Sequence, residues 1–143
     1  MKLVALLGAL AVAGCSGLKI YSSDAPKNVR IASHLEGARA VLHVHEVTGP
    51  CATRYEGTVK LDQPAVDLGV PAGRSSFLVV GFDTSSILGG QRGTTVGTVV
   101  TPRDGYRYEL GVRYKDNLYD VGLREIDRKG TSRDLPRGGV GGC

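Results

Sequence analysis

Two histidines of this 143-residue chain stand two positions apart, and their spacing would give them a shared direction on a strand. His43 and His45 fall within residues 39–47, where apolar residues alternate as in a half-buried strand. Alternate side chains of a strand share a face, so both imidazoles would point the same way. Such a pair binds a transition metal when a further ligand, here His34 or Glu36, completes the site. No spacing rule positions that ligand, so we predict partly exposed strand histidines without a metal. A metalloprotein or hydrolase that uses this pair is kept as an alternative.

Other arrangements that perform catalysis are weaker in this sequence. Serines, histidines and aspartates are present, but no Gly-x-Ser-x-Gly motif presents a nucleophilic serine. Two of the carboxylates considered as an acid/base pair lie in a turn region and two flank the hairpin, where solvated side chains are expected. Residues 116–120 hold only part of a calcium-binding loop. These carboxylates are Asp62, Asp67, Asp116 and Asp120. We therefore predict a non-enzymatic protein without a cofactor.

Four tyrosines form the third group of chemically informative side chains: Tyr106, Tyr108, Tyr114 and Tyr119. An open row of aromatic rings would provide a platform for a glycan or a peptide. An alternating row is more typical of the face of a strand that packs against the core. We favour the core assignment.

The N-terminus carries the features of an export signal. Lys2 precedes an apolar run from Leu3 to Ala13, and small residues then lead to Cys15. A transmembrane helix needs about 20 apolar residues, so this run is too short to span a bilayer. The alternative to the interpretation below is an ordinary cleaved signal peptide in which Cys15 is coincidental.

Residues 12–15, Val-Ala-Gly-Cys, resemble the lipobox of bacterial lipoproteins. The resemblance implies that residues 1–14 are removed as a signal peptide, that the thiol of Cys15 is acylated, and that the new N-terminus is acylated too. Two or more acyl chains hold a protein stably on a bilayer, whereas one chain holds it only marginally. In this class an aspartate after the cysteine is the usual signal for inner-membrane retention. Ser16 therefore suggests the outer membrane, and we expect the periplasmic face.

Acylation of Cys15 would leave Cys51 and Cys143 as the remaining cysteines. Two cysteines in an oxidising compartment usually pair, so we predict a Cys51–Cys143 disulfide. The alternative is a free thiol at the end of a flexible tail, available for an intermolecular bridge.

Composition limits the classes of partner. Removing the 14 residues before Cys15 from the 143 would leave 129, which suits one domain. The formal net charge of +4 would fall to +3 with the loss of Lys2. This excess is too small to predict a nucleic-acid partner, and export argues against one further. It is compatible with anionic lipid headgroups or wall polymers, but we favour an ordinary mixed-charge surface as its explanation.

After residue 27 the chain reads as short strands separated by Gly, Pro, Asp and Asn, with no helical pattern. This indicates an all-β fold, a single antiparallel β-sandwich at residues 28–127 that resembles immunoglobulin-like or transthyretin-like envelope modules. Residues 15–27 are predicted to form a lipidated tether, and the Gly-rich residues 128–143 a mobile tail. The apolar run 77–82 is predicted to be a central strand buried on both faces. Predicted strands are 28–33, 39–47, 55–61, 65–68 and 77–82, followed by a hairpin at 105–127.

The hairpin is the most specific structural prediction. A two-residue turn at Asp116 and Asn117 pairs apolar with apolar and acidic with basic residues along both strands. The predicted pairs are Tyr114 with Tyr119, Val112 with Val121, Leu110 with Leu123, Arg113 with Asp120, and Glu109 with Arg124. The same register sets Tyr108 opposite Glu125, so we expect the pairing to loosen or bulge there.

The whole chain resembles small uncharacterised lipoproteins of Gram-negative bacteria. We therefore expect a membrane-anchored periplasmic protein with a binding or structural role in the envelope. An envelope protein is its expected partner, in contact with a sheet edge or with the loop at residues 85–93. A small inhibitor or a module that binds cell-wall glycan is the alternative from another functional class.

Overall fold

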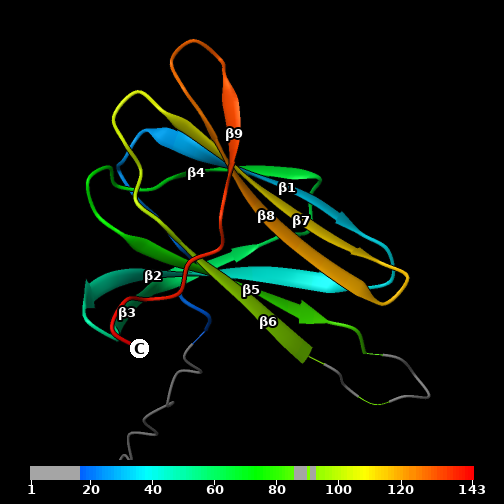
Figure 1. The fold of residues 1–143 in the computed structure, drawn as a ribbon. Helices are drawn as coiled ribbons and strands as arrows, with labels where there is room; N and C mark the ends of the chain where they lie inside the picture. The colour runs from blue at the N-terminus through cyan, green and yellow to red at the C-terminus, as the bar shows by residue number, and fades with distance from the viewer. Residues whose placement is uncertain (1–16, 86–89, 91–92) are drawn as a thin grey trace, which may run out of the picture.

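The computed structural model describes residues 17–85, 90 and 93–143, and it confirms the predicted β-sandwich (Figure 1). Nine strands form two facing sheets, and this part of the chain contains no helix. The strands are β1 (Lys27–Leu35), β2 (Arg39–Gly49), β3 (Ala52–Lys60), β4 (Ala65–Gly69), β5 (Ser76–Asp83), β6 (Gly93–Val100), β7 (Arg107–Lys115), β8 (Leu118–Ile126) and β9 (Ser132–Leu135).

One sheet has the strand order β4-β1-β7-β8-β9 and the other has the order β3-β2-β5-β6. All neighbouring strands run antiparallel except β1 and β7, which pair in parallel from Val29–Tyr108 to Leu35–Tyr114. The prediction of a purely antiparallel sandwich is therefore wrong at this one pair. A parallel neighbour needs a long connection, and here the chain passes through the second sheet between the two strands.

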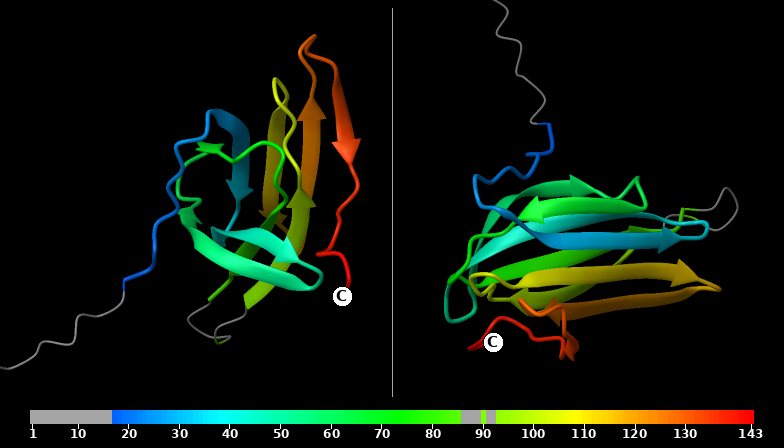
Figure 2. Two further views of the ribbon diagram at one scale, coloured as in Figure 1. Left: turned by 90° about the vertical axis from the view of Figure 1, so that its left-hand side faces the viewer. Right: turned by 90° about the horizontal axis from the view of Figure 1, so that it is seen from above.

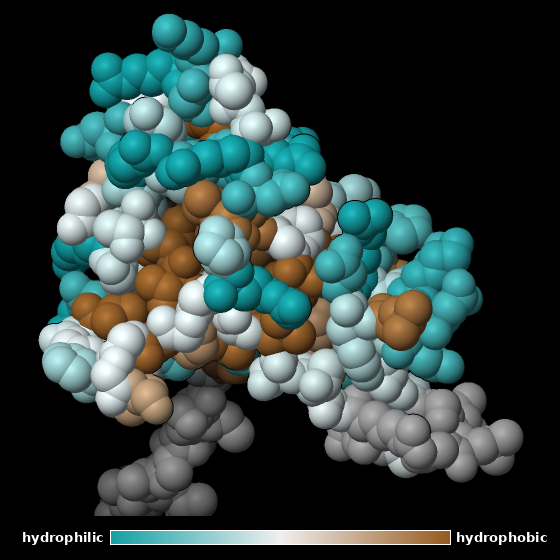
Figure 3. All heavy atoms as spheres, viewed as in Figure 1, coloured by the Kyte–Doolittle hydropathy of each residue, from teal (hydrophilic) through white to brown (hydrophobic). Residues whose placement is uncertain are grey.

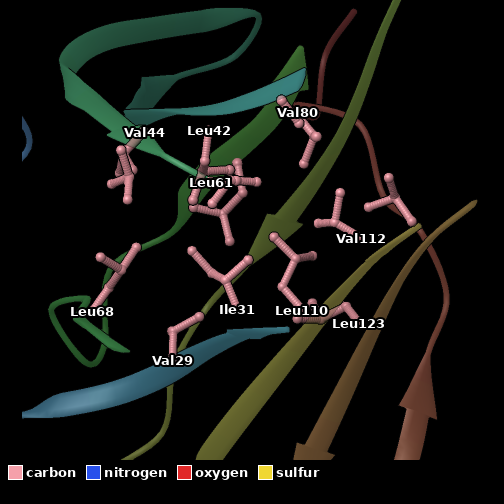
Figure 4. Packing of buried hydrophobic residues seen from close by; sticks show 14 of the residues in the cluster. Val29, Ile31, Leu42, Val44, Leu61, Leu68, Val80, Leu110, Val112 and Leu123 are labelled. Carbon is pink, nitrogen blue, oxygen red and sulfur yellow. The ribbon is translucent and has the colours of Figure 1, made fainter. Parts of the chain in front are cut away.

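The core lies between the sheets and is built from alternate residues of each strand. Ile31 and Leu110 from one sheet face Leu42 and Val80 from the other, and all four are fully buried (Figure 4). Burying an aliphatic side chain of this size contributes about 1.5–3 kcal/mol. The core therefore supplies the main force that holds the two sheets together.

The hairpin of β7 and β8 has the predicted register at every pair named above. Asp116 and Asn117 form the turn with φ values of 51° and 62°, as a two-residue turn that follows the strand twist requires. The predicted loosening is wrong, because Tyr108 pairs with Glu125 and the ladder continues to Arg107 and Ile126.

Strand β5 also differs from its prediction. Leu78, Val80 and Phe82 are buried in the core, whereas Phe77 and Val79 are half-exposed on the opposite side of the sheet. The continuous apolar run therefore has one buried face, and its other face belongs to an apolar outer surface of the sandwich. Strands β6 and β9 lie outside the predicted strands.

The N-terminal segment is attached to the domain from Lys19 onward. The amide of Tyr21 donates to the carbonyl of Thr58 over 3.0 Å, and the amide of Thr58 donates to the carbonyl of Lys19 over 2.8 Å. A Cβ on Gly57 would lie 2.6 Å from the backbone of Tyr21, so this close approach requires glycine. Residues 19–21 of the segment expected to be a tether thus lie on β3.

The C-terminal tail crosses the opposite edge of the sandwich (Figure 2). It leaves β9, and the carbonyl of Gly138 accepts a hydrogen bond from the amide of Val99 on β6 over 2.9 Å. It ends at the β2–β3 turn, where Cys143 forms a disulfide with Cys51 and the Cα atoms lie 4.9 Å apart. Hydrophobic surface is concentrated where this tail crosses from one sheet to the other. Hydrophilic residues cover the end of the sandwich at the β8–β9 turn (Figure 3).

Candidate interaction surface

The outer surface of the four-stranded sheet is unusually apolar, and we name it the aromatic face. His45 on β2 lies between Tyr55 on β3 and Phe77 on β5 in the strand register. The ring centroid of His45 is 5.4 Å from that of Tyr55 and 6.3 Å from that of Phe77. The aromatic face consists of Val41, His43, His45, Tyr55, Phe77, Val79 and Val99, of which Tyr55 is exposed and the others are half-exposed.

A β-bulge shapes this face. The pairing of β2 with β3 shifts register between Val44, which faces Gly57, and His45, which faces Tyr55. The extra residue on β3 lets Tyr55 and Thr58 share a face, although residues three apart on a regular strand point to opposite sides. Sequence reasoning missed this arrangement, and Gly57 is the one residue in the strand that signals a bulge.

A short polar chain links the two strands beneath the rings. Nδ1 of His43 lies 2.8 Å from the hydroxyl of Thr58, and the hydroxyl of Tyr55 lies 2.6 Å from the same oxygen. The Tyr55 hydroxyl also donates to the carbonyl of Lys19 over 3.3 Å. Because Thr58 is only 1% exposed, these bonds satisfy a buried hydroxyl and fix the orientation of the His43 ring.

His45 has a different environment from His43. Burial lowers the pKa of the His45 imidazole, and the nearby His43 lowers that pKa further. The neutral form of His45 is thereby favoured, which suits contact with apolar groups as well as with the two neighbouring rings.

The two residues considered as a third metal ligand, His34 and Glu36, are not grouped with the histidine pair. His34 lies on β1 in the other sheet, where its Nε2 is 2.9 Å from a carboxylate oxygen of Glu36. Within the described residues, no group of three His, Cys, Asp or Glu side chains is close enough to hold a metal ion. The suggestion that His34 or Glu36 completes a site with His43 and His45 is therefore wrong.

The candidate carboxylates do not converge on a site. Asp67 lies 3.4 Å from Arg30, and Asp120 lies 3.4 Å from Arg113, both as exposed ion pairs. Asp62 is exposed beside β3, and Asp116 forms the hairpin turn. Tyr108 and Tyr114 are buried in the core, which confirms the core assignment for these two tyrosines.

A buried carboxylate that sequence reasoning missed explains why the hairpin continues past Tyr108. Glu125 is 5% exposed and accepts hydrogen bonds from the Tyr108 hydroxyl over 2.9 Å, from Arg133 over 2.9 Å and from Arg103. Burial raises the pKa of Glu125, but these three donors outweigh burial and leave the pKa below its ordinary value. The guanidinium of Arg103 also lies 3.8 Å from the centroid of the Tyr106 ring. These contacts give the cluster a structural role.

The outer face of the five-stranded sheet has the opposite character, and we name it the charged face. One row across all five strands alternates in charge: Asp67, Arg30, Glu109, Arg124 and Asp134. The two ends of the row form ion pairs, at 3.4 Å between Arg30 and Asp67 and at 3.2 Å between Arg124 and Asp134. Such a row keeps its face well solvated.

A groove of about 620 Å³ opens at the end of the sandwich where β2 begins and β3 ends. Its apolar lining includes Leu35, Val41 and Leu61, and the basic residues Arg39 and Lys60 also line it. Its full lining is Ser33, His34, Leu35, Ala38, Arg39, Ala40, Val41, Lys60, Leu61, Asp62, Gln63 and Pro64. It adjoins the aromatic face through Val41.

Two predicted features fall on residues that the structure does not describe. Cys15, which is predicted to be acylated, and most of the loop at residues 85–93 lie outside the described ranges. In the described ranges no helix is long and apolar enough to cross a membrane.

Comparison of the chain with protein-family models, curated proteins and solved structures finds no match. The aromatic face and the charged face are therefore the features of the molecule that bear on its function.

Proposed function

We propose that this protein is a lipid-anchored lipoprotein of the cell envelope with a non-enzymatic binding role. Acylation of Cys15 within the lipobox-like residues 12–15 would attach it to the periplasmic face of the outer membrane. The disulfide between Cys51 and Cys143 is compatible with an oxidising compartment. An envelope protein is the proposed partner.

The observation that supports a binding role is the apolar character of the aromatic face. Antiparallel sheets that face water usually carry polar side chains there, as the charged face does. Phe77, Val79 and Val41 instead expose part of their apolar surface on neighbouring strands. A contiguous apolar patch on a folded domain marks a contact site, because covering the patch removes unfavourable hydration. We therefore assign the partner to this face.

The experiment that tests the anchored binding role compares the wild-type chain with Cys15→Ser in detergent-solubilised envelopes. Mass spectrometry of the wild-type protein should show acylation at Cys15, and affinity capture should recover a defined set of envelope proteins. Cys15→Ser should lack the acyl chains and lose those partners that are met at the membrane. Absence of acylation from the wild-type protein would refute the proposal.

A glycan-binding module is the second candidate, because Tyr55 and Phe77 place aromatic rings on both sides of His45. Open aromatic rings present flat apolar surface to a ligand, and sugar rings have a matching apolar side. Saturable binding to purified wall polymer, lost in Tyr55→Ala, would favour this function over a protein partner. No binding at any polymer concentration would exclude it.

A further inference from the structure

We propose that the bilayer itself contacts the domain at the β3 edge of the aromatic face, in a region that we name the membrane corner and define by Leu18, Ile20 and Tyr55. This inference rests on the proposed function, since it takes Cys15 as the acylated residue. It specifies how the domain is held: close against the headgroups in a fixed orientation, with the aromatic face beside the lipid surface.

The first argument is chain length. A free tether of residues 15–27 would span about 40 Å at full extension. The free part of the tether is much shorter in the structure, because Lys19 and Tyr21 are hydrogen-bonded to Thr58 on β3. Ile20 is only five residues after Cys15, so its Cα lies within about 18 Å of the acylated residue. Leu18 lies within about 11 Å.

The attachment of this segment is firm on both sides. Gly57 allows the backbone of Tyr21 to approach β3, and the Tyr21 hydroxyl donates to the carbonyl of Gly69 on β4 over 2.8 Å. A Cβ on Gly69 would lie 2.0 Å from the carbonyl oxygen of Ala25. The segment therefore follows the domain as one body, and the domain cannot move far from the membrane without breaking these contacts.

The second argument is the chemistry of the side chains nearest the anchor. Leu18 is 65% exposed and Ile20 is 61% exposed, whereas most large apolar residues of the described chain are buried. Ile20 pairs with Thr58, so its side chain lies on the same side of the sheet as Thr58 and His43. Tyr55 adds an exposed ring with a polar tip, a side chain suited to the boundary between headgroups and acyl chains.

The corner also carries a positive charge that suits anionic lipid headgroups. Lys19 lies between the two exposed aliphatic residues and is itself exposed. A lysine whose stem lies along apolar surface keeps its ammonium in the headgroup layer, where anionic lipids attract it. Together these residues form a short amphipathic contact next to the acyl anchor.

The test uses single tryptophan reporters, because the chain contains no tryptophan. Ile20→Trp and Leu18→Trp report on the membrane corner. Leu118→Trp is the matched control, because Leu118 is 73% exposed at the β7–β8 turn, at the far end of the sandwich (Figure 1). Each acylated full-length variant is reconstituted into phosphatidylethanolamine–phosphatidylglycerol vesicles, and fluorescence quenching is measured with iodide and with bromine-labelled acyl chains.

We expect severalfold weaker iodide quenching at positions 18 and 20 on vesicles than for the Cys15→Ser forms in solution, together with quenching by the brominated lipid. Position 118 should remain open to iodide and insensitive to brominated lipid. Equal iodide access at positions 20 and 118 in protein that floats with the vesicles would overturn the membrane corner while leaving the lipid anchor intact. Shielding of position 20 in the Cys15→Ser form at rising protein concentration would assign the corner to a second copy instead. Failure of the wild-type chain to be acylated or to float would refute the anchor and this inference with it.

Discussion

The two outer faces of this sandwich both face water, but one carries charged side chains and the other carries apolar and aromatic side chains. The charged face carries the row from Asp67 to Asp134, in which every neighbour across the strands has the opposite sign. The aromatic face carries Val79, Phe77 and two imidazoles at the equivalent outward positions of β2 and β5. Both faces lie over the same core, so core packing alone does not account for the difference.

The side chains on these two faces contribute little to stability, for different reasons. Exposed ion pairs such as Arg30–Asp67 contribute only about 0–1 kcal/mol each, so the charged face serves mainly solubility. Half-exposed apolar side chains on the aromatic face lose part of the stabilisation that full burial would give them. On the proposed function, contact with a partner and with lipid would cover this apolar surface.

The largest effect on stability is expected at the end of the four-stranded sheet, where the disulfide holds the β2–β3 turn. Replacing both cysteines, Cys51→Ser with Cys143→Ser, should lower the free energy of unfolding by about 4–5 kcal/mol, because the disulfide closes a loop of 92 residues in the unfolded chain. Urea unfolding measures this change. An unchanged urea midpoint would show that the tail is held by its hydrogen bonds alone.

The next effect concerns the bulge that shapes the aromatic face. Gly57→Ala should cost about 1–3 kcal/mol, because its Cβ would meet the backbone of Tyr21 at 2.6 Å and force a shift. Gly122→Ala on the charged face is the control, because a Cβ there has no atom within 4 Å. Thermal unfolding of both variants compares the two faces directly, and equal losses would contradict the assigned close approach.

Glu125 provides a prediction that depends on pH. Glu125→Gln should destabilise the protein by about 1–3 kcal/mol at neutral pH, because it weakens charge-assisted hydrogen bonds to a nearly buried group. The folded pKa of Glu125 lies below the ordinary 4.5, so the unfolded chain takes up this proton more readily. The stability gained from the carboxylate is therefore full above about pH 4.5 and is lost as the pH falls through the folded pKa.

Urea unfolding of wild type and Glu125→Gln across pH 3–7 checks that dependence. The difference in unfolding free energy between the two proteins should shrink toward the acid end. A difference that stays constant over the range would show that the ionised form is not the one that Arg103 and Arg133 stabilise.

The smallest effect is expected on the charged face. Arg124→Ala should change the free energy of unfolding by less than about 1 kcal/mol, since the side chain and its partner Asp134 are largely in water. The change should shrink further in high salt. A large loss that persists in high salt would mean that the alternating row is a structural element, and the contrast between the faces would then lose its basis.

Sequence patterning predicted the regular parts of the fold well. In the β7–β8 hairpin the outward charges and inward apolar residues between Glu109 and Arg124 agree on one register, because a slip by one residue would invert both faces. The parallel pairing of β1 with β7 could not be predicted in this way, because the alternation of apolar and polar residues within a strand does not indicate the direction of the neighbouring strand. Strand β9 was missed because its polar residues, Ser132 to Asp134, pair at a sheet edge without a buried apolar face.

The aromatic face was only half predicted. His43 and His45 were correctly placed on one side of a strand, but their neighbours depend on the β2–β3 register shift at Gly57. The sequence wrongly predicted a loosened pairing at Glu125, because a carboxylate on the core side of a strand does not fit the apolar pattern of that face. Its donors Arg103 and Arg133 come from outside the hairpin, and only the folded structure brings them together.

The most direct test of the aromatic face as the binding surface is affinity capture from solubilised envelopes with Val79→Lys. Leu118→Lys is the control, since it makes the same change at an exposed apolar residue on the β7–β8 turn. Both variants should be acylated and folded like the wild type. We predict that Val79→Lys loses the captured envelope proteins while Leu118→Lys retains them. Full capture by Val79→Lys would contradict the assignment of the partner to this face.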